Sequence, residues 1–312
     1  MRHLLILFVA IMAVGCNPTP SEPTIPPVKE RQGWDNEWFP LRGDVESLCT
    51  VLYQKVQTPQ GEIIEEADTM TQAFFNEQGD LLRKVSPSGE VRATYNKQGK
   101  LSSLTDFNLD GEIDCIRYYV YNAEGDVEQI RKMDGEGRLE VKALHTYNAE
   151  GQLIRVERFG EQGESLGFTQ YTYIDGRLIE EQYYTMGQFV GSVLYRYDRE
   201  GRVEEEVQYR SDNTAAGRVL YGYDVRGNLI DEKFYENGAE KPALHHTYTI
   251  NPNDTRLTWS IYCPDEKGRE KRTDLSRYSY DRQGNIILTE FYAPEGEEEV
   301  LRSQLKVTIN YR

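Results

Sequence analysis

The stretch DFNLDGEID, residues 106–114, has oxygen-bearing side chains at the spacing that a bound calcium ion requires. Asp106, Asn108 and Asp110 occupy alternate positions, and Glu112 would add a backbone carbonyl oxygen. The glycine between them permits a sharp bend, and Asp114 would complete the ligand set or hold a water molecule. These residues predict a structural Ca²⁺ site.

The flanking sequence limits this prediction. Position twelve of the loop is Arg117 instead of the bidentate glutamate of an EF-hand, and no helical periodicity surrounds it. The pattern is similar to calcium loops of β-hairpins, which end at the ninth position. The same residue types also favour turns without any metal, so a plain Asx turn is the alternative.

Other candidate chemistry is sparse. His145 and His246 stand where related segments have tyrosine, so we interpret them as packing residues. The sequence contains no nucleophile elbow, zinc-protease motif or phosphate-binding loop. Glutamate runs at 204–206 and 297–299 are read as solvated strand faces. We therefore expect no enzymatic activity; the alternative is a carbohydrate-active hydrolase that uses a carboxylate pair.

A repeated motif organises most of the chain. It reads aromatic–Asn/Asp–x–x–Gly, and its opening aromatics are separated by 20, 26, 26, 26, 24, 26, 25 and 32 residues. A modal period of 26 residues is typical of a repeat array. The opening aromatics are Phe75, Tyr95, Tyr121, Tyr147, Tyr173, Tyr197, Tyr223, Tyr248 and Tyr280.

The turn chemistry predicts hairpins. In Asn148-Ala149-Glu150-Gly151 the first side chain accepts a backbone hydrogen bond, and the glycine adopts the left-handed conformation. A second glycine-containing turn precedes most opening aromatics by ten residues. We predict an all-β fold: a curled or superhelical antiparallel meander of about ten hairpins. The sequence leaves open whether this sheet closes.

Pairs of aromatic residues lie on one face of alternate strands, because side chains two positions apart share a face. We identify six tyrosines of three successive units as candidate ligand-binding residues for a glycan or an envelope protein. They are Tyr171, Tyr173, Tyr195, Tyr197, Tyr221 and Tyr223.

The N-terminal residues predict a signal peptide followed by a proline-rich tether. Residues 1–15 contain a basic start and an apolar run of eleven, too short to span a bilayer as a helix. The segment AVGC resembles a bacterial lipobox and predicts lipidation of Cys16. Residues 16–33 form a proline-rich tether, 34–71 are expected to cap the first sheet edge with Trp34 and Trp38, and 72–312 hold the repeats.

Net charge and cysteine spacing limit the kinds of partner and metal site that we expect. A net charge of −16, from 52 acidic and 36 basic residues, argues against nucleic acid. Cys49, Cys115 and Cys263 match no zinc spacing, and we interpret them as small buried hydrophobic residues. We expect the protein to associate with the membrane through the lipid on Cys16.

The repeat, with Tyr-Asp-x-x-Gly-x-Leu as its core, resembles the YD or RHS repeat family over about residues 72–292. This resemblance implies the short lipoprotein variety found in Bacteroidetes-like bacteria, without a toxin domain. We accordingly expect a lipid-anchored protein of the cell envelope, in the outer membrane by resemblance to sorting rules. Its role would be a non-enzymatic binding module or scaffold, with an RHS-toxin-related scaffold as a further alternative.

Overall fold

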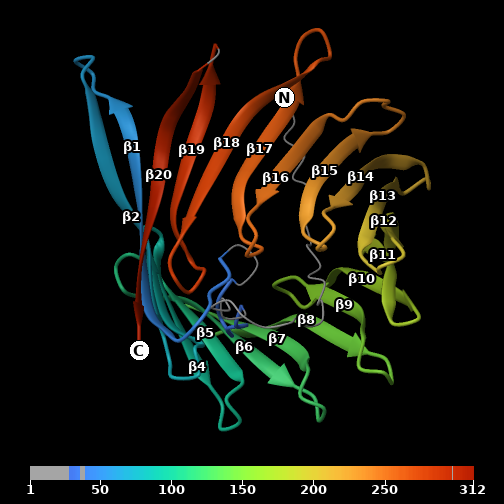
Figure 1. The fold of residues 1–312 in the computed structure, drawn as a ribbon. Helices are drawn as coiled ribbons and strands as arrows, with labels where there is room; N and C mark the ends of the chain where they lie inside the picture. The colour runs from blue at the N-terminus through green and yellow to red at the C-terminus, as the bar shows by residue number, and fades with distance from the viewer. Residues whose placement is uncertain (1–27, 36–38, 297) are drawn as a thin grey trace.

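The computed structural model describes residues 28–35, 39–296 and 298–312, and the described chain is all β (Figure 1). The predicted signal peptide, Cys16, the first part of the tether and Trp38 lie outside the described residues. Within the described ranges, no helix is long and apolar enough to cross a membrane. The strands are β1 (Val45–Gln57), β2 (Ile63–Phe75), β3 (Leu81–Ser86), β4 (Gly89–Tyr95), β5 (Leu101–Phe107), β6 (Ile113–Tyr121), β7 (Val127–Asp134), β8 (Leu139–Tyr147), β9 (Leu153–Phe159), β10 (Ser165–Ile174), β11 (Arg177–Thr185), β12 (Gln188–Tyr197), β13 (Val203–Arg210), β14 (Ala215–Tyr223), β15 (Leu229–Glu236), β16 (Leu244–Ile250), β17 (Arg256–Pro264), β18 (Glu270–Tyr280), β19 (Ile286–Glu295) and β20 (Glu298–Tyr311).

The twenty strands form one closed antiparallel ring. Each strand pairs with the next along the chain, and β1 also pairs with β20, from Val45 opposite Tyr311 to Gln54 opposite Ser303. The predicted all-β hairpin meander is confirmed. Closure, which the sequence left open, removes both free edges of the sheet.

Repeated bulges accompany this curvature. Most hairpins carry a register shift beside the opening aromatic, as between Thr146 and Tyr147, and many carry another near the opposite turn. A β-bulge bends its strand and increases the local twist. Such bends, recurring from hairpin to hairpin, let a sheet of this size curl back on itself.

The tight turns form as their residues predict. The side-chain Oδ1 of Asn148 accepts the backbone NH of Gln152 at 2.8 Å, and Gly151 has a φ of 79°. Equivalent bonds recur in the other units, for example from Asn228 NH to Asp224 at 2.9 Å. The turn type therefore sets the hairpin register around the ring.

A third glycine position keeps neighbouring strands close. A Cβ added to Gly167 would lie 2.0 Å from the carbonyl oxygen of Tyr184, and one on Gly191 would lie 2.5 Å from that of Tyr209. Gly89 makes the same approach to Phe107. Only glycine fits where one strand's Cβ would enter the neighbouring backbone.

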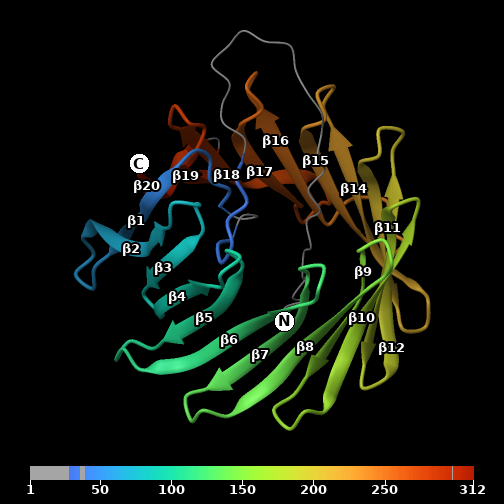
Figure 2. The ribbon, with the colours of Figure 1, turned by 90° about the horizontal axis from the view of Figure 1, so that it is seen from below.

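Residues 28–35 and 39–43, which we call the strap, lie inside the ring beside its seam (Figure 2). Arg31 is buried and donates to the carbonyl oxygens of Gly79 and Gly43 at 2.6 and 2.7 Å. On the other side of the seam, the backbone NH of Arg42 donates to the side-chain Oδ1 of Asn285 at 2.7 Å. The strap thus connects turns on both sides of β1 and β20.

The main core lies beneath the strap. It contains Leu41, Val45, Leu48, Ala73, Phe75, Leu81 and Val307. Trp34 packs edge-on against Phe75 at 5.2 Å. The region 34–71, which we expected to cap a free edge, holds part of the strap, β1 and most of β2, and β1 pairs with β20.

Candidate functional site

The six candidate tyrosines lie on one face of β10, β12 and β14. This face points into the ring, because it is the face on which Tyr95 contacts the strap: its hydroxyl donates to Gln32 carbonyl at 3.2 Å. Register alternation then places the tyrosines of later strands on the same inner face. The structure therefore brings the predicted residues together.

The hydroxyls of the opening tyrosines are engaged within the protein. Tyr173 donates to Leu153 carbonyl at 3.0 Å, and Tyr223 donates to Val203 carbonyl at 2.8 Å. The acceptor is in each case the first residue of the second strand of the preceding hairpin. The same bond is made by Tyr95, Tyr121, Tyr147, Tyr197 and Tyr280.

Further tyrosines donate to inner-face carboxylates, of which Glu181 is buried and Glu206 and Glu232 are half-buried. Tyr195 and Tyr183 donate to the two oxygens of Glu181 at 3.0 and 2.7 Å, and Tyr221 donates to Glu206 at 2.8 Å. Tyr248 donates to Glu232 in the same way. We call this set the tyrosine–glutamate row: Glu181, Glu206, Glu232, Tyr183, Tyr195, Tyr221 and Tyr248.

The three glutamates occupy every second strand. Glu181 lies on β11, Glu206 on β13 and Glu232 on β15, and cross-strand pairing aligns each with a tyrosine of the preceding strand. At about 4.8 Å per strand, neighbouring carboxylates in the row are about 10 Å apart. They form a spaced series of acids along the inner face.

Burial controls the electrostatics of the row. Desolvation raises the pKa of Glu206; the Tyr221 hydrogen bond opposes this shift, and the negative charges of Glu181 and Glu232 reinforce it. Burial likewise raises the pKa of Tyr195 and of Tyr221, and both stay protonated donors at neutral pH. Within the row, Glu206 is therefore an acid whose ionised form is destabilised.

An aromatic cluster extends the row onto β16 and β17. His246 packs edge-on against Trp259 at 5.3 Å, and Trp259 stacks near Tyr248 at 6.4 Å. The Arg256 guanidinium lies over the Tyr248 ring, 4.1 Å from its centre. Trp259 Nε1 is buried and has no hydrogen-bond partner. His246 is thus a packing residue beside Glu232, at 3.3 Å.

The structure corrects one position of the repeat. Ile250, and not Tyr248, immediately precedes the turn residue Asn251 and pairs across the bulge as an opening aromatic does. Tyr248 is therefore the residue two positions earlier, equivalent to Tyr221. This explains why its hydroxyl reaches a glutamate and not a backbone carbonyl.

Sequence reasoning missed the glutamates of the row. Glu206 and Glu232 each lie nine residues after an opening tyrosine, and Glu181 lies eight after Tyr173, whose turn is one residue shorter. In each case a tyrosine precedes the next turn at the matching position. Reading these two repeat positions together would have found the pairs.

The predicted calcium loop joins β5 to β6 and makes the bonds of an Asx turn. Asn108 Oδ1 accepts the backbone NH groups of Asp110 and Glu112 at 3.0 and 2.9 Å. Asp106 lies on the inner face, where Arg117 pairs with it at 3.1 Å. Asn108 is thus engaged by the turn and Asp106 by Arg117.

In the described part of the chain, no three His, Cys, Asp or Glu side chains are placed to hold a metal ion. The three cysteines are free; Cys115 is buried, and Cys49 and Cys263 are half-buried. Calcium binding by residues 106–114 stays a prediction for experiment.

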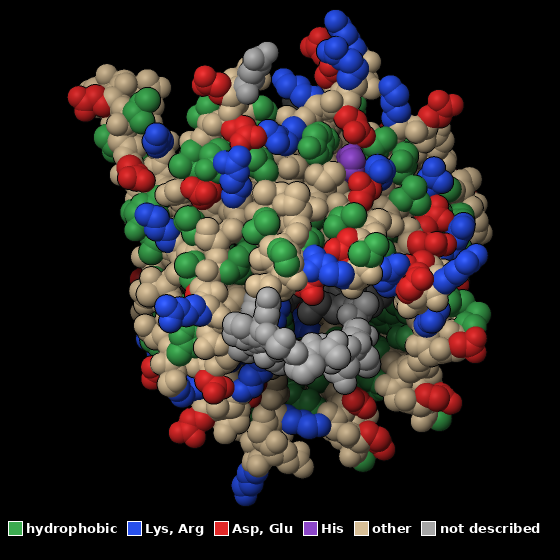
Figure 3. Space-filling view, in the orientation of Figure 1, with side chains coloured by type: hydrophobic (Ala, Val, Ile, Leu, Met, Phe, Trp, Pro, Cys, Tyr) green, Lys and Arg blue, Asp and Glu red, His purple; other side chains and the backbone are tan. Residues whose placement is uncertain are grey.

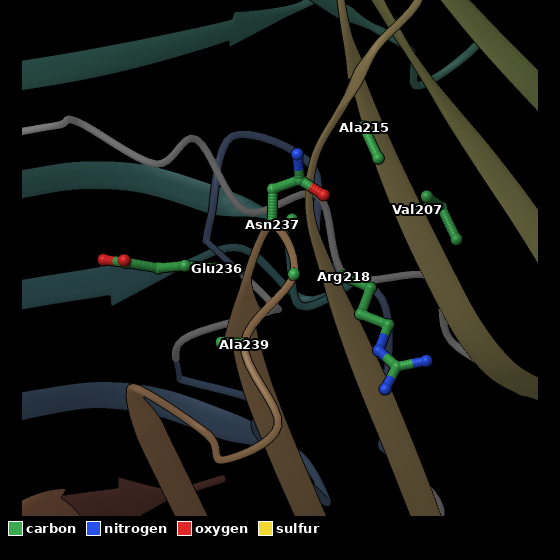
Figure 4. A pocket seen from close by; sticks show the side chains of 8 residues that line it. Val207, Ala215, Arg218, Glu236, Asn237 and Ala239 are labelled. Carbon is green, nitrogen blue, oxygen red and sulfur yellow. The ribbon is translucent and has the colours of Figure 1, made fainter.

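A shallow cavity of about 300 Å³ lies at the ends of β13, β14 and β15 (Figure 4). Its walls include Ala215, Gly217 and Ala239, and Arg218 and Glu236 point in different directions from it. Arg218 pairs with Glu205 at 3.6 Å. The polar groups do not converge, so the cavity offers no arrangement for chemistry.

Charged side chains of both signs are interspersed on the face shown in Figure 3. The ion pairs of the described chain include the cross-strand pair of Arg196 with Glu205 at 2.9 Å. This face has no extended basic patch of the kind that binds nucleic acid.

No protein-family model matches this sequence, and no curated protein sequence matches it. Solved structures show coarse similarity. A TcdB2-TccC3-Cdc42 structure is 15% identical with a TM-score of 0.43, over 84% of this chain and 16% of that one. A porin-like protein from Bacteroides uniformis is 10% identical with a TM-score of 0.36, over 85% of this chain and 98% of that one. A DUF3836 family protein from Bacteroides vulgatus is 20% identical with a TM-score of 0.23, over 27% and 89%.

Proposed function

We propose that this protein is a non-enzymatic scaffold of the cell envelope, anchored by a lipid on Cys16, that engages a glycan or protein ligand. The observation that carries the scaffold role is the tyrosine ladder within a closed ring. Seven tyrosine hydroxyls hold neighbouring units together, and β1 pairs with β20. Such a frame keeps its shape while its surface binds a partner.

The lipid anchor is supported by the sequence of the first sixteen residues. A short basic start, an apolar run and AVGC are the parts of a lipoprotein signal. By resemblance, Asn17 favours the outer membrane. In this proposal the lipid holds the ring at the membrane through the proline-rich tether.

Metabolic labelling with a fatty acid tests the anchor. The full chain should incorporate label and fractionate with outer membranes, and Cys16→Ser should lose both properties. Asn17→Ala provides a matched control that should keep the label. Labelling of the Cys16→Ser protein, or its retention in membranes, would contradict the proposal.

Among the described residues, we would assign the carboxylates of the row to the alternative hydrolase. A glycosidase needs one protonated and one ionised carboxyl flanking the sugar. Glu181 already accepts two tyrosine hydroxyls and Glu206 accepts one. Hydrolysis of aryl glycosides by the full chain that disappears in Glu206→Gln would overturn the non-enzymatic role.

A further inference from the structure

One end of the ring carries an exposed apolar series. Antiparallel pairing places the turns β5–β6, β7–β8, β9–β10 and β11–β12 at the same end, and Figures 1 and 2 show them in succession. We call their exposed large hydrophobic residues the apolar rim. These are Leu109, Ile113, Leu139, Leu166, Met186 and Val190.

The exposure of the rim is high for residues of this type. Leu109 is 77% exposed and Met186 is 79% exposed, and the other four range from 44% to 53%. Single exposed hydrophobic residues need no explanation, but a series of them on successive turns at one end is a candidate interaction site. Successive turns on one end are separated by two strands, about 10 Å.

Met186 breaks the local rules of its turn. It occupies a left-handed position, with a φ of 49°, in the two-residue turn Met186-Gly187. The equivalent turn at Asp175-Gly176 has a φ of 49° on aspartate, a residue that tolerates this conformation. A strained and exposed methionine is an outlier that points to a functional role for this turn.

The turns of the rim also carry an excess of acidic residues, one of which, Glu140, is paired with Lys142. The ranges 108–114, 134–140, 160–166 and 185–190 contain eight acidic residues and one arginine. That arginine, Arg138, pairs with Asp134 at 2.6 Å and with Glu136 at 3.4 Å. The charge excess excludes two kinds of occupant: a second copy would bring the same acids, and anionic lipid would repel them.

We propose that the apolar rim is the docking surface for a basic, amphipathic segment of a protein partner. Its apolar side chains would cover Leu166, Met186 and Val190, and its lysines or arginines would meet the carboxylates of the neighbouring turns. Charge complementarity of this kind sets partner choice and association rate. The strap contacts turns at the other end of the ring, so an anchored chain leaves the rim free.

This inference rests on the proposed binding role but fails separately from it. The probe is a fluorescent amphipathic helical peptide of leucine and lysine, titrated against the full-length protein by anisotropy. The comparison peptide has glutamate in place of lysine. We expect binding of the lysine peptide, weakening with added salt, and no binding of the glutamate peptide.

Substitutions in the apolar rim test whether the lysine peptide binds there. Leu166→Ser with Met186→Ser should weaken lysine-peptide binding by about tenfold or more, because apolar contacts at an interface centre dominate affinity. The matched control is Val225→Ser, a fully exposed residue at the opposite end of the ring. All three sites are exposed, so the variants should melt like the parent protein.

Three results would overturn the proposal: no lysine-peptide binding, binding unchanged by the rim substitutions, or equal loss in Val225→Ser. Vesicles of phosphatidylcholine with phosphatidylglycerol form a separate arm, and binding to them through the rim would also reject a protein partner. Fatty-acid labelling of Cys16 is unaffected by any of these outcomes.

Discussion

The hydroxyl of Tyr147 donates a 2.9 Å hydrogen bond to the carbonyl oxygen of Val127, twenty residues earlier in the chain. Six other tyrosines make the equivalent bond, so one repeat position connects nearly every hairpin to its predecessor. Three of these six, Tyr173, Tyr197 and Tyr223, are candidate ligand-binding residues whose hydroxyls also hold the frame together.

Tyr147→Phe should lower the free energy of unfolding by about 1 kcal/mol, the usual net value of one hydrogen bond. The ring and its packing remain, and only the donor to Val127 carbonyl is lost. Urea unfolding measures the change. Tyr209→Phe, on the opposite face of the sheet, is the control, and an equal loss in both variants would refute the ladder's role.

Glu206→Gln should raise the melting temperature at neutral pH. The folded state raises the pKa of Glu206, so this carboxyl favours folding fully only below its unfolded pKa, near 4.5. As pH rises through the folded pKa, that contribution is lost and the buried charge becomes a cost. Glutamine removes the charge and keeps an acceptor for Tyr221.

The gain from Glu206→Gln should therefore shrink as pH falls through the raised folded-state pKa toward 4.5, because the parent carboxyl becomes protonated over this range. Thermal melts across this range test the prediction. Glu204→Gln, at an exposed neighbouring position, should change little. A constant gain at every pH would show that charge is not the cause.

Tyrosine ionisation should destabilise the ring at high pH. Burial raises the pKa of Tyr223, Tyr280 and Tyr311 to about 12 each, from an ordinary value of 10.0. A raised tyrosine pKa means that stability is complete below pH 10 and is lost between pH 10 and about 12. Phenolate absorbance and circular dichroism should change together over that interval; ionisation near pH 10 without unfolding would contradict the burial.

Gly167→Ala should cost about 2 kcal/mol or more, because the new Cβ would meet the Tyr184 carbonyl oxygen at 2.0 Å. Gly163→Ala is the matched control: it also has a positive φ, but open space surrounds it. That control should cost only about 1–2 kcal/mol, the strain of the left-handed conformation. Similar losses in denaturant unfolding would argue against close strand approach.

Removal of calcium should lower the melting temperature, because the clustered carboxylates of residues 106–114 repel one another when no cation lies among them. The measurement compares melts in EDTA and in excess calcium for the parent and for Asp110→Ala. A higher melting temperature in calcium that Asp110→Ala abolishes would establish the ion site that the sequence predicted.

Local features of this fold were open to prediction because they depend on neighbouring residues. Asn148 and Gly151 define a turn through bonds within five residues, and alternation places Tyr171 and Tyr173 on one face. The candidate tyrosine face followed from the same local rules. The sequence pattern does not reveal that Tyr248 lies two positions before the residue that opens the turn. A shift of two positions along a strand keeps a side chain on the same face, so the alternation of faces is unchanged.

The sequence by itself determined an all-β chain of hairpin repeats, since turn chemistry and side-chain alternation act over a few residues. Only the tertiary structure decided that β20 returns to β1, that the strap lies beside this seam, and that Glu181, Glu206 and Glu232 align on the inner face. The reason is physical: closure is the sum of small twists and bulges around twenty strands, and no single repeat contains that sum.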